Sequence, residues 1–310
     1  DPEQGPFIIK DANYFILGDS MIQSDEVEIK KRMGQILRNN KINTIEIGYS
    51  SWNPYQYENI FKKYNFNSNS IFFVFLYWND FAPSYNMSYY RTLQKYGNSY
   101  PREKNIVIQK FKNFAVFFIE NSFVVRTIFD EYIKYTNPIK LDNEISFKIE
   151  ESHSEANQLN CDALNEIKED TLIFDIISFS KDSSCWSDLI TESVDQTIIS
   201  IKRLKKIIPD DSEILFFFAP AGWSFENENT TGRKNKWFEI NDNISISSHG
   251  LIKRIREDVD IFDLSKILSE NKNDVQENFL YFAKDGHWTE NSHKIIGKYL
   301  LSLINEKYVD

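Results

Sequence analysis

Short apolar runs alternate with amphipathic segments along the first part of the chain. Residues 13–17 and 44–47 are predicted strands, and the continuous apolar run at 71–76 is typical of a strand buried on both faces. Between these strands, residues 26–38 and 54–64 have the periodicity of helices. Strands that alternate with helices indicate a parallel sheet with right-handed crossovers. The pattern therefore predicts a βαβαβ unit.

This rhythm is lost between residues 81 and 180. The region has loop-like stretches rich in tyrosine, asparagine and serine, and one predicted helix at 106–135. We expect residues 81–180 to be a partly helical insertion within a single domain that spans residues 1–310. The parallel pattern then returns, with predicted strands at 213–219 and 259–263 and predicted helices at 188–208, 246–258 and 291–304.

Composition and charge narrow the class of protein. The 310 residues have a formal net charge of -10 and no basic stripe with interleaved aromatic residues, so we expect no nucleic-acid partner. No apolar stretch reaches the roughly 18 residues of a membrane span. The first residue is Asp1 rather than methionine, which is consistent with a leader or a membrane anchor outside the sequence given.

Two polar motifs at opposite ends of the chain point to acyl chemistry. Gly18, Asp19 and Ser20 directly follow the first predicted strand, and Asp285 and His287 lie two residues apart before the last predicted helix. A serine hydroxyl becomes a good nucleophile when a base takes its proton, and the base works best when a third group holds it. Each motif alone is weak evidence, but together they indicate a Ser-His-Asp triad.

Two further polar segments, at residues 48–52 and 78–80, also follow predicted strands. In an open parallel sheet, ligands bind beyond the carboxyl ends of the strands. This order and spacing of motifs resembles the SGNH hydrolase superfamily, also called the GDSL esterases, over nearly the whole chain outside the insertion. The resemblance implies a three-layer α/β/α fold with a flavodoxin-like parallel sheet of about five strands.

The resemblance also implies a role for each motif. Ser20 is the expected nucleophile, and its backbone N–H and the side-chain amide of Asn79 are expected to stabilise the oxyanion. His287 is the expected base, and Asp285 is the carboxylate that orients it. Their separation of two residues, rather than the commoner three, resembles the branch that contains alginate and peptidoglycan O-acetyltransferases and their esterase relatives. O-acylated glycans are therefore the favoured substrates.

The second motif departs from the family pattern. Alignment on the usual Asn-x-Gly-x-x-Gly puts Ser51 at the glycine whose N–H completes the oxyanion hole. A backbone N–H does not require glycine, but a turn with positive φ would strain a serine. Gly48 and Ser51 are therefore both candidates for this donor.

Simpler structural roles are open for several of these residues. Ser20 would serve as a helix cap, Asn79 as a turn cap and His287 as a core histidine. His293 is the other candidate base, but its place inside the last predicted helix favours a structural role. Asp19 is expected to shape its turn through hydrogen bonds.

The predicted function is a serine esterase that removes O-acyl groups, with O-acetyl favoured, from a small-molecule or glycan ester. An O-acyltransferase acting on a polysaccharide is the first alternative. A lipase or thioesterase with the aromatic insertion as a lid, and an inactive glycan-binding relative, are the others. Neither cysteines nor histidines have metal-binding spacing, so we expect no metal and no cofactor.

An enzyme of this class is expected to be extracytoplasmic, whether periplasmic, secreted or membrane-anchored. Cys161 and Cys185 are the only cysteines and lie close in sequence. They form either one disulfide or two buried thiols, and an oxidising compartment favours the disulfide.

Overall fold

The structure is a computed structural model. It describes residues 12–50, 52–64, 66–83, 161, 164, 172–224, 247–271, 280–282 and 286–308, without the side chains of residues 62, 63 and 172–174. These residues belong to one compact unit formed by residues 1–87 and 152–310. The helix predicted at 106–135 and most of the predicted insertion at 81–180 lie outside the described residues. Ser51 and Asp285 also lie outside them.

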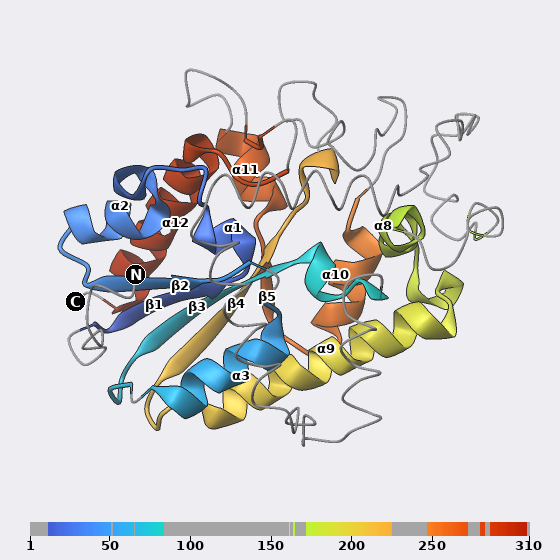
Figure 1. Cartoon of the computed structure of the whole chain (residues 1–310), viewed down its shortest axis with the longest axis horizontal. Coiled ribbons are helices and arrows are strands. Elements are labelled where there is room, and N and C mark those ends of the chain that lie inside the picture. The colour runs from blue at the N-terminus through green and yellow to red at the C-terminus, as the bar shows by residue number, and fades with distance from the viewer. Residues whose placement is uncertain are drawn as a thin grey trace, which may run out of the picture. The chain divides into compact units, whose positions relative to one another are not determined.

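Five parallel strands form one sheet in the order β2-β1-β3-β4-β5 (Figure 1). The strands are β1 (Tyr14–Gly18), β2 (Thr44–Gly48), β3 (Ile71–Tyr77), β4 (Glu213–Ala219) and β5 (Ile261–Asp263). This strand order is that of flavodoxin-like folds. The predicted fold class is therefore confirmed.

Helices cover both faces of the sheet. Helices α2 (Met33–Asn39) and α12 (Glu290–Tyr308) pack together on one face, and α3 (Pro54–Lys63) and α9 (Asp188–Ile207) pack together on the other (Figure 1). The remaining described α-helices are α1 (Ser20–Gln23), α8 (Leu172–Ser180), α10 (His249–Arg256) and α11 (Ser265–Asn271). None of the helices in the described part of the chain is long and apolar enough to cross a membrane.

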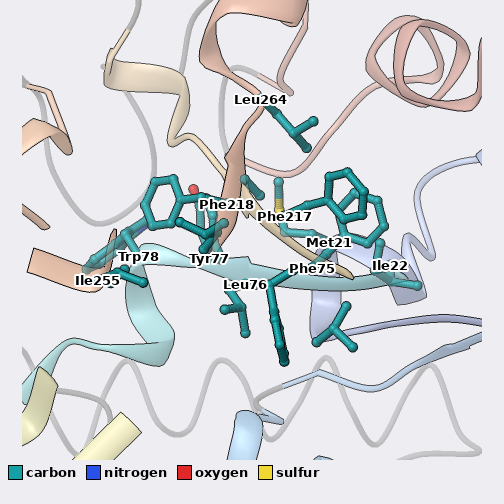
Figure 2. Packing of buried hydrophobic residues seen from close by; sticks show 14 of the residues in the cluster. Met21, Ile22, Phe75, Leu76, Tyr77, Trp78, Phe217, Phe218, Ile255 and Leu264 are labelled. Atoms are coloured by element: carbon teal, nitrogen blue, oxygen red, sulfur yellow. The ribbon is translucent and has the colours of Figure 1, made fainter. Parts of the chain in front are cut away.

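The central strands are apolar because helices bury both of their faces. All seven residues of β3 are buried, as the continuous apolar run predicted. Figure 2 shows apolar side chains of this core around β3 and β4, including Met21 and Ile22 of α1. The short helix that begins at the candidate nucleophile is thus anchored in the core by its second and third residues.

Three phenylalanines form a ladder across the sheet. Phe75 on β3, Phe217 on β4 and Phe262 on β5 occupy matching positions of their strands. The ring of Phe217 stacks on both neighbours, with centroid distances of 5.1 Å to Phe75 and 5.2 Å to Phe262. Neighbouring strands lie about 4.8 Å apart, so aligned aromatic rings come into stacking contact. The ladder accounts for part of the high aromatic content.

One predicted element is wrong in its extent. The helix predicted at 26–38 is instead a 3₁₀ turn at Ile29–Lys31 followed by α2, with Arg32 in an extended conformation between them. The Arg32 Nε–H donates to the Val27 carbonyl at 2.9 Å, which holds the chain in a loop. The segment has the apolar periodicity of a helix, but this local bond accompanies a break in the helix at Arg32.

The two cysteines form a disulfide. Cys161 and Cys185 are joined with their Cα atoms 5.2 Å apart. The expected pairing is therefore confirmed.

The ladder makes a testable contribution to stability. We expect Phe217→Ala to lower the free energy of unfolding by about 3–5 kcal/mol, because it leaves a cavity between two stacked rings. Phe262→Ala should cost less, since Phe262 lies at the end of the ladder and is 38% exposed. Urea unfolding of both variants measures the difference, and equal losses would contradict a ladder centred on Phe217.

Candidate active site

The candidate site lies where the order of the strands reverses. Strand β1 has β2 on one side and β3 on the other. The connection after β1 therefore leads to one side of β1, and the connection after β2 leads back to the other side. Loops that leave the carboxyl ends of such neighbouring strands diverge and form a crevice. The segments after Gly18, Gly48 and Tyr77 all start at this edge.

Ser20 is the first residue of α1. Asp19 precedes it as the N-cap, and the Asp19 carboxylate accepts a hydrogen bond from the Met21 N–H at 2.9 Å. The cap is thus Asp19, so Ser20 does not have the capping role considered from the sequence. The Ser20 N–H lies in the first turn, where a helix offers it no acceptor of its own. The turn therefore presents both a half-buried hydroxyl and a backbone donor at one residue.

Gly48 ends β2 directly against α1. A Cβ atom at this position would lie 2.3 Å from the backbone nitrogen of Gln23, so only glycine permits this close approach. The Gln23 side chain in turn accepts a hydrogen bond from the Ser50 N–H at 2.5 Å. Packing thus explains Gly48 without an oxyanion role, and the choice between Gly48 and Ser51 stays open.

Asn79 lies in a 3₁₀ turn, Trp78–Asp80, directly after β3. The Asp80 carboxylate accepts a hydrogen bond from the Tyr77 N–H at 2.8 Å, which closes the turn. Two buried hydroxyls of α9 hold its far side, because Thr197 donates to the Asp80 carbonyl at 2.9 Å and Ser193 donates to the Phe81 carbonyl at 2.8 Å. The backbone that carries Asn79 is therefore fixed by a neighbouring helix.

His287 lies in a small hairpin before α12. Tyr281 pairs with Trp288 across the hairpin, and Gly286 supplies the positive φ of 77° that its turn requires. Both aromatic residues are fully buried, and the Tyr281 hydroxyl donates to the Pro220 carbonyl just after β4 at 2.5 Å. The hairpin is thus attached to the same edge of the sheet as the other motifs.

The carboxylate of Asp19 connects these segments. It is almost fully buried, it interacts with the Asn79 side chain, and its charge interacts with that of His287. Burial raises the pKa of Asp19, while the Met21 N–H, the charge of His287 and the Asn79 hydrogen bond all oppose this rise. The Asp19 side chain therefore connects the turn that carries Ser20 to Asn79, the expected oxyanion donor, and to His287, the expected base.

A second buried carboxyl group lies close to Asp19. Burial and then the charge of Asp19 raise the pKa of Asp80 well above its ordinary value. Burial also raises the pKa of Tyr57 well above its ordinary value, with smaller contributions from both carboxylates. Because two buried like charges are costly, burial and mutual repulsion favour the protonated form of Asp80 more strongly than that of Asp19.

Two further observations concern the histidines. A carboxylate that was not singled out from the sequence, Glu26, lies with its Oε1 atom 3.8 Å from His287 Nδ1. His293 is fully buried in α12, and its Nε2 atom lies 2.8 Å from the Ser24 Oγ atom. Ser24 Oγ donates to the Met21 carbonyl, so the His293 Nε2–H donates to Ser24. Through this hydrogen bond, His293 holds the loop after α1 in place.

Asp19, which directly precedes Ser20, interacts with Asn79 and His287, and Gly48 lies against α1. Asp285 and Ser51 lie outside the described residues, so their roles stay predictions. Sequence reasoning missed the supporting residues Glu26, Ser193 and Thr197, which have no motif of their own, and it assigned no role to Asp80 within the segment 78–80. Within the described ranges, no group of three or more His, Cys, Asp or Glu residues is arranged to hold a metal ion.

Comparison with known proteins adds little to this geometry. No family model and no curated protein matches the sequence. Among solved structures, the chain is similar to a member of the lipolytic protein G-D-S-L family from Veillonella parvula, with a TM-score of 0.38 and 9% sequence identity. The match covers 94% of this chain and 97% of that chain. A score this low carries no argument, so the chemistry of the site rests on its own residues.

The buried His293 should make stability depend on pH. Burial, and secondarily the charge of Arg32, lowers the pKa of His293 from 6.5 to about 3. Below pH 6.5 His293 is therefore protonated in the unfolded chain but stays neutral in the folded protein. The free energy of unfolding thus falls as the pH drops from 6.5 toward 3. We expect wild type to lose about 2 kcal/mol more between pH 7 and pH 5 than His293→Gln does.

Urea unfolding at the two pH values measures this difference. The matched control is His249→Gln, because the side chain of His249 is exposed. If His293→Gln keeps the full pH dependence of wild type, His293 is not held neutral in the folded protein.

Proposed function

We propose that this protein is a serine esterase of the SGNH type. The observation that carries the proposal is the Asp19 carboxylate, which caps the helix that begins at Ser20 and interacts with both Asn79 and His287. A nucleophile, an oxyanion donor and a base are the three groups that acyl transfer requires. The proposal is supported because the candidates for these three groups adjoin or interact with one buried side chain, Asp19, at the edge of the sheet where the strand order reverses.

The proposed reaction has two halves. The Ser20 hydroxyl attacks the acyl carbonyl while His287 takes its proton, and His287 then returns that proton to the leaving alcohol. Water, activated by His287 in the same way, releases the acid from Ser20. The Ser20 N–H and the Asn79 amide stabilise the oxyanion, and donors of this kind are typically worth about 3–4 kcal/mol of barrier each. Asp285 is proposed to orient His287.

The proposed substrate is an O-acylated glycan, with O-acetyl as the favoured acyl group. Tyr49 and Trp52, which follow β2, lie with their ring centroids 5.2 Å apart, and 47% of Tyr49 is exposed. The Tyr49 N–H donates to the carbonyl of Gly18, two residues before Ser20, at 3.3 Å. An exposed aromatic surface so close to a nucleophile suits the apolar face of a sugar ring.

Loss of the hydroxyl nucleophile tests the mechanism. We expect Ser20→Ala to abolish hydrolysis of p-nitrophenyl acetate and labelling by a fluorophosphonate probe, while the melting temperature stays nearly unchanged because the helix cap is Asp19. His287→Ala should lower turnover by at least about a thousandfold. His293→Gln is the control, and it should keep activity at a temperature where it remains folded. A folded Ser20→Ala variant with wild-type activity would contradict the assignment.

The exposed aromatic pair tests the substrate class. We expect Tyr49→Ala to raise the KM for acetylated xylo-oligosaccharides by about three- to tenfold, as loss of one ring contact would. Hydrolysis of p-nitrophenyl acetate should change less than about twofold, because this substrate has no sugar. Tyr64→Ala is the matched control. Tyr64 is also exposed, but it follows the C-terminal end of α3, whereas Tyr49 precedes the N-terminal end. Equal losses on both substrates would contradict a role for Tyr49 in sugar binding.

A further inference from the structure

Glu26 lies beside the proposed base although no motif contains it. Its Oε1 atom is 3.8 Å from His287 Nδ1, and 38% of the Glu26 side chain and 23% of the His287 side chain are exposed. This separation suits an ion pair and is too long for a direct hydrogen bond. Glu26 therefore acts on His287 through its charge.

The loop that contains Glu26 is held firmly on both sides. Ser24 adopts a left-handed conformation with φ of 46°, and its carbonyl accepts a hydrogen bond from the Val27 N–H at 2.9 Å. The Ser24 hydroxyl is bound to His293, and the buried Val27 accepts from Arg32. These bonds hold the backbone just before and just after Glu26, at the position from which its carboxylate reaches His287.

Other charges near this pair do not replace Glu26. Asp19 faces His287 from the buried side, and Asp285 is its near neighbour in the chain. The next acidic residue in the loop, Glu28, is paired with Lys30 at 2.8 Å. Glu26 is thus a partly exposed acid beside His287, whereas Asp19 is buried.

We propose that Glu26 is a positioning residue for His287. The charge of Glu26 stabilises the imidazolium that forms when His287 takes the proton of Ser20. The inference rests on the proposed function for its catalytic consequence, but the charge contact itself does not. Removal of the Glu26 charge makes the imidazolium less stable. Because the pair is partly exposed, its strength also falls as salt screens it.

The test is a titration of His287 by NMR in the full-length protein labelled with ¹³C-histidine. The His287 signal is assigned by its loss in His287→Gln. We expect Glu26→Gln to lower the titration midpoint of His287 by about 0.3–0.7 pH unit, as an exposed ion pair allows. Glu28→Gln is the matched control, because it makes the same change in net charge two residues away. Added salt should lower the midpoint in wild type and change it less in Glu26→Gln.

Kinetics then connect this shift to catalysis. Since the base must be neutral, the acid limb of the kcat/KM profile should move to lower pH in Glu26→Gln, while the plateau falls about two- to fivefold. A midpoint that matches wild type in Glu26→Gln, or moves equally in Glu28→Gln, overturns the inference and leaves the esterase proposal standing. A lowered midpoint in a protein whose wild type hydrolyses no ester upholds the charge contact and contradicts the proposed function.

Discussion

The arrangement of the site depends on one buried carboxylate, that of Asp19. Burial of a charge is costly unless hydrogen bonds and an opposite charge compensate for it. Here the Met21 N–H, the side chain of Asn79 and the charge of His287 supply that compensation. The same contacts require three separate segments of the chain to meet at one point. The need to stabilise Asp19 and the need to assemble the site are therefore met by one set of interactions.

The core supports this arrangement by fixing where the strands end. Phe75 and Phe217 stack across β3 and β4, so these two strands are held in one register up to the carboxyl edge. Beyond that edge, Thr197 binds the backbone of the turn that carries Asn79, and Tyr281 binds the end of β4. Each connection is buried and directional. The loops of the site thus depend on helices and strands that do not belong to it.

The sequence predicts those strands, helices and site residues that a local pattern of residues identifies. The apolar run at 71–76 identified β3 because a strand buried on both faces has few alternatives, and Ser20 and Asn79 were found because they directly follow strands. The helix predicted at 26–38 was wrong because Arg32 binds the Val27 carbonyl, and periodicity does not report such a bond. Glu26 was missed for a related reason, since its proximity to His287 exists only in the folded chain.

Three acids in and around the site, Asp80, Asp19 and Glu26, illustrate how environment separates the roles of one chemical group. Asp80 is buried beside another carboxylate, which raises its pKa, and it accepts the Tyr77 N–H that closes its turn. Asp19 is equally buried, but its donors and His287 favour its charged form. Glu26 is partly exposed, so its charge needs no buried partner, but solvent and salt weaken its effect. Asp19 and Glu26 thus act on the same imidazole from environments of different exposure, so solvent and salt weaken the effect of Glu26 more than that of Asp19.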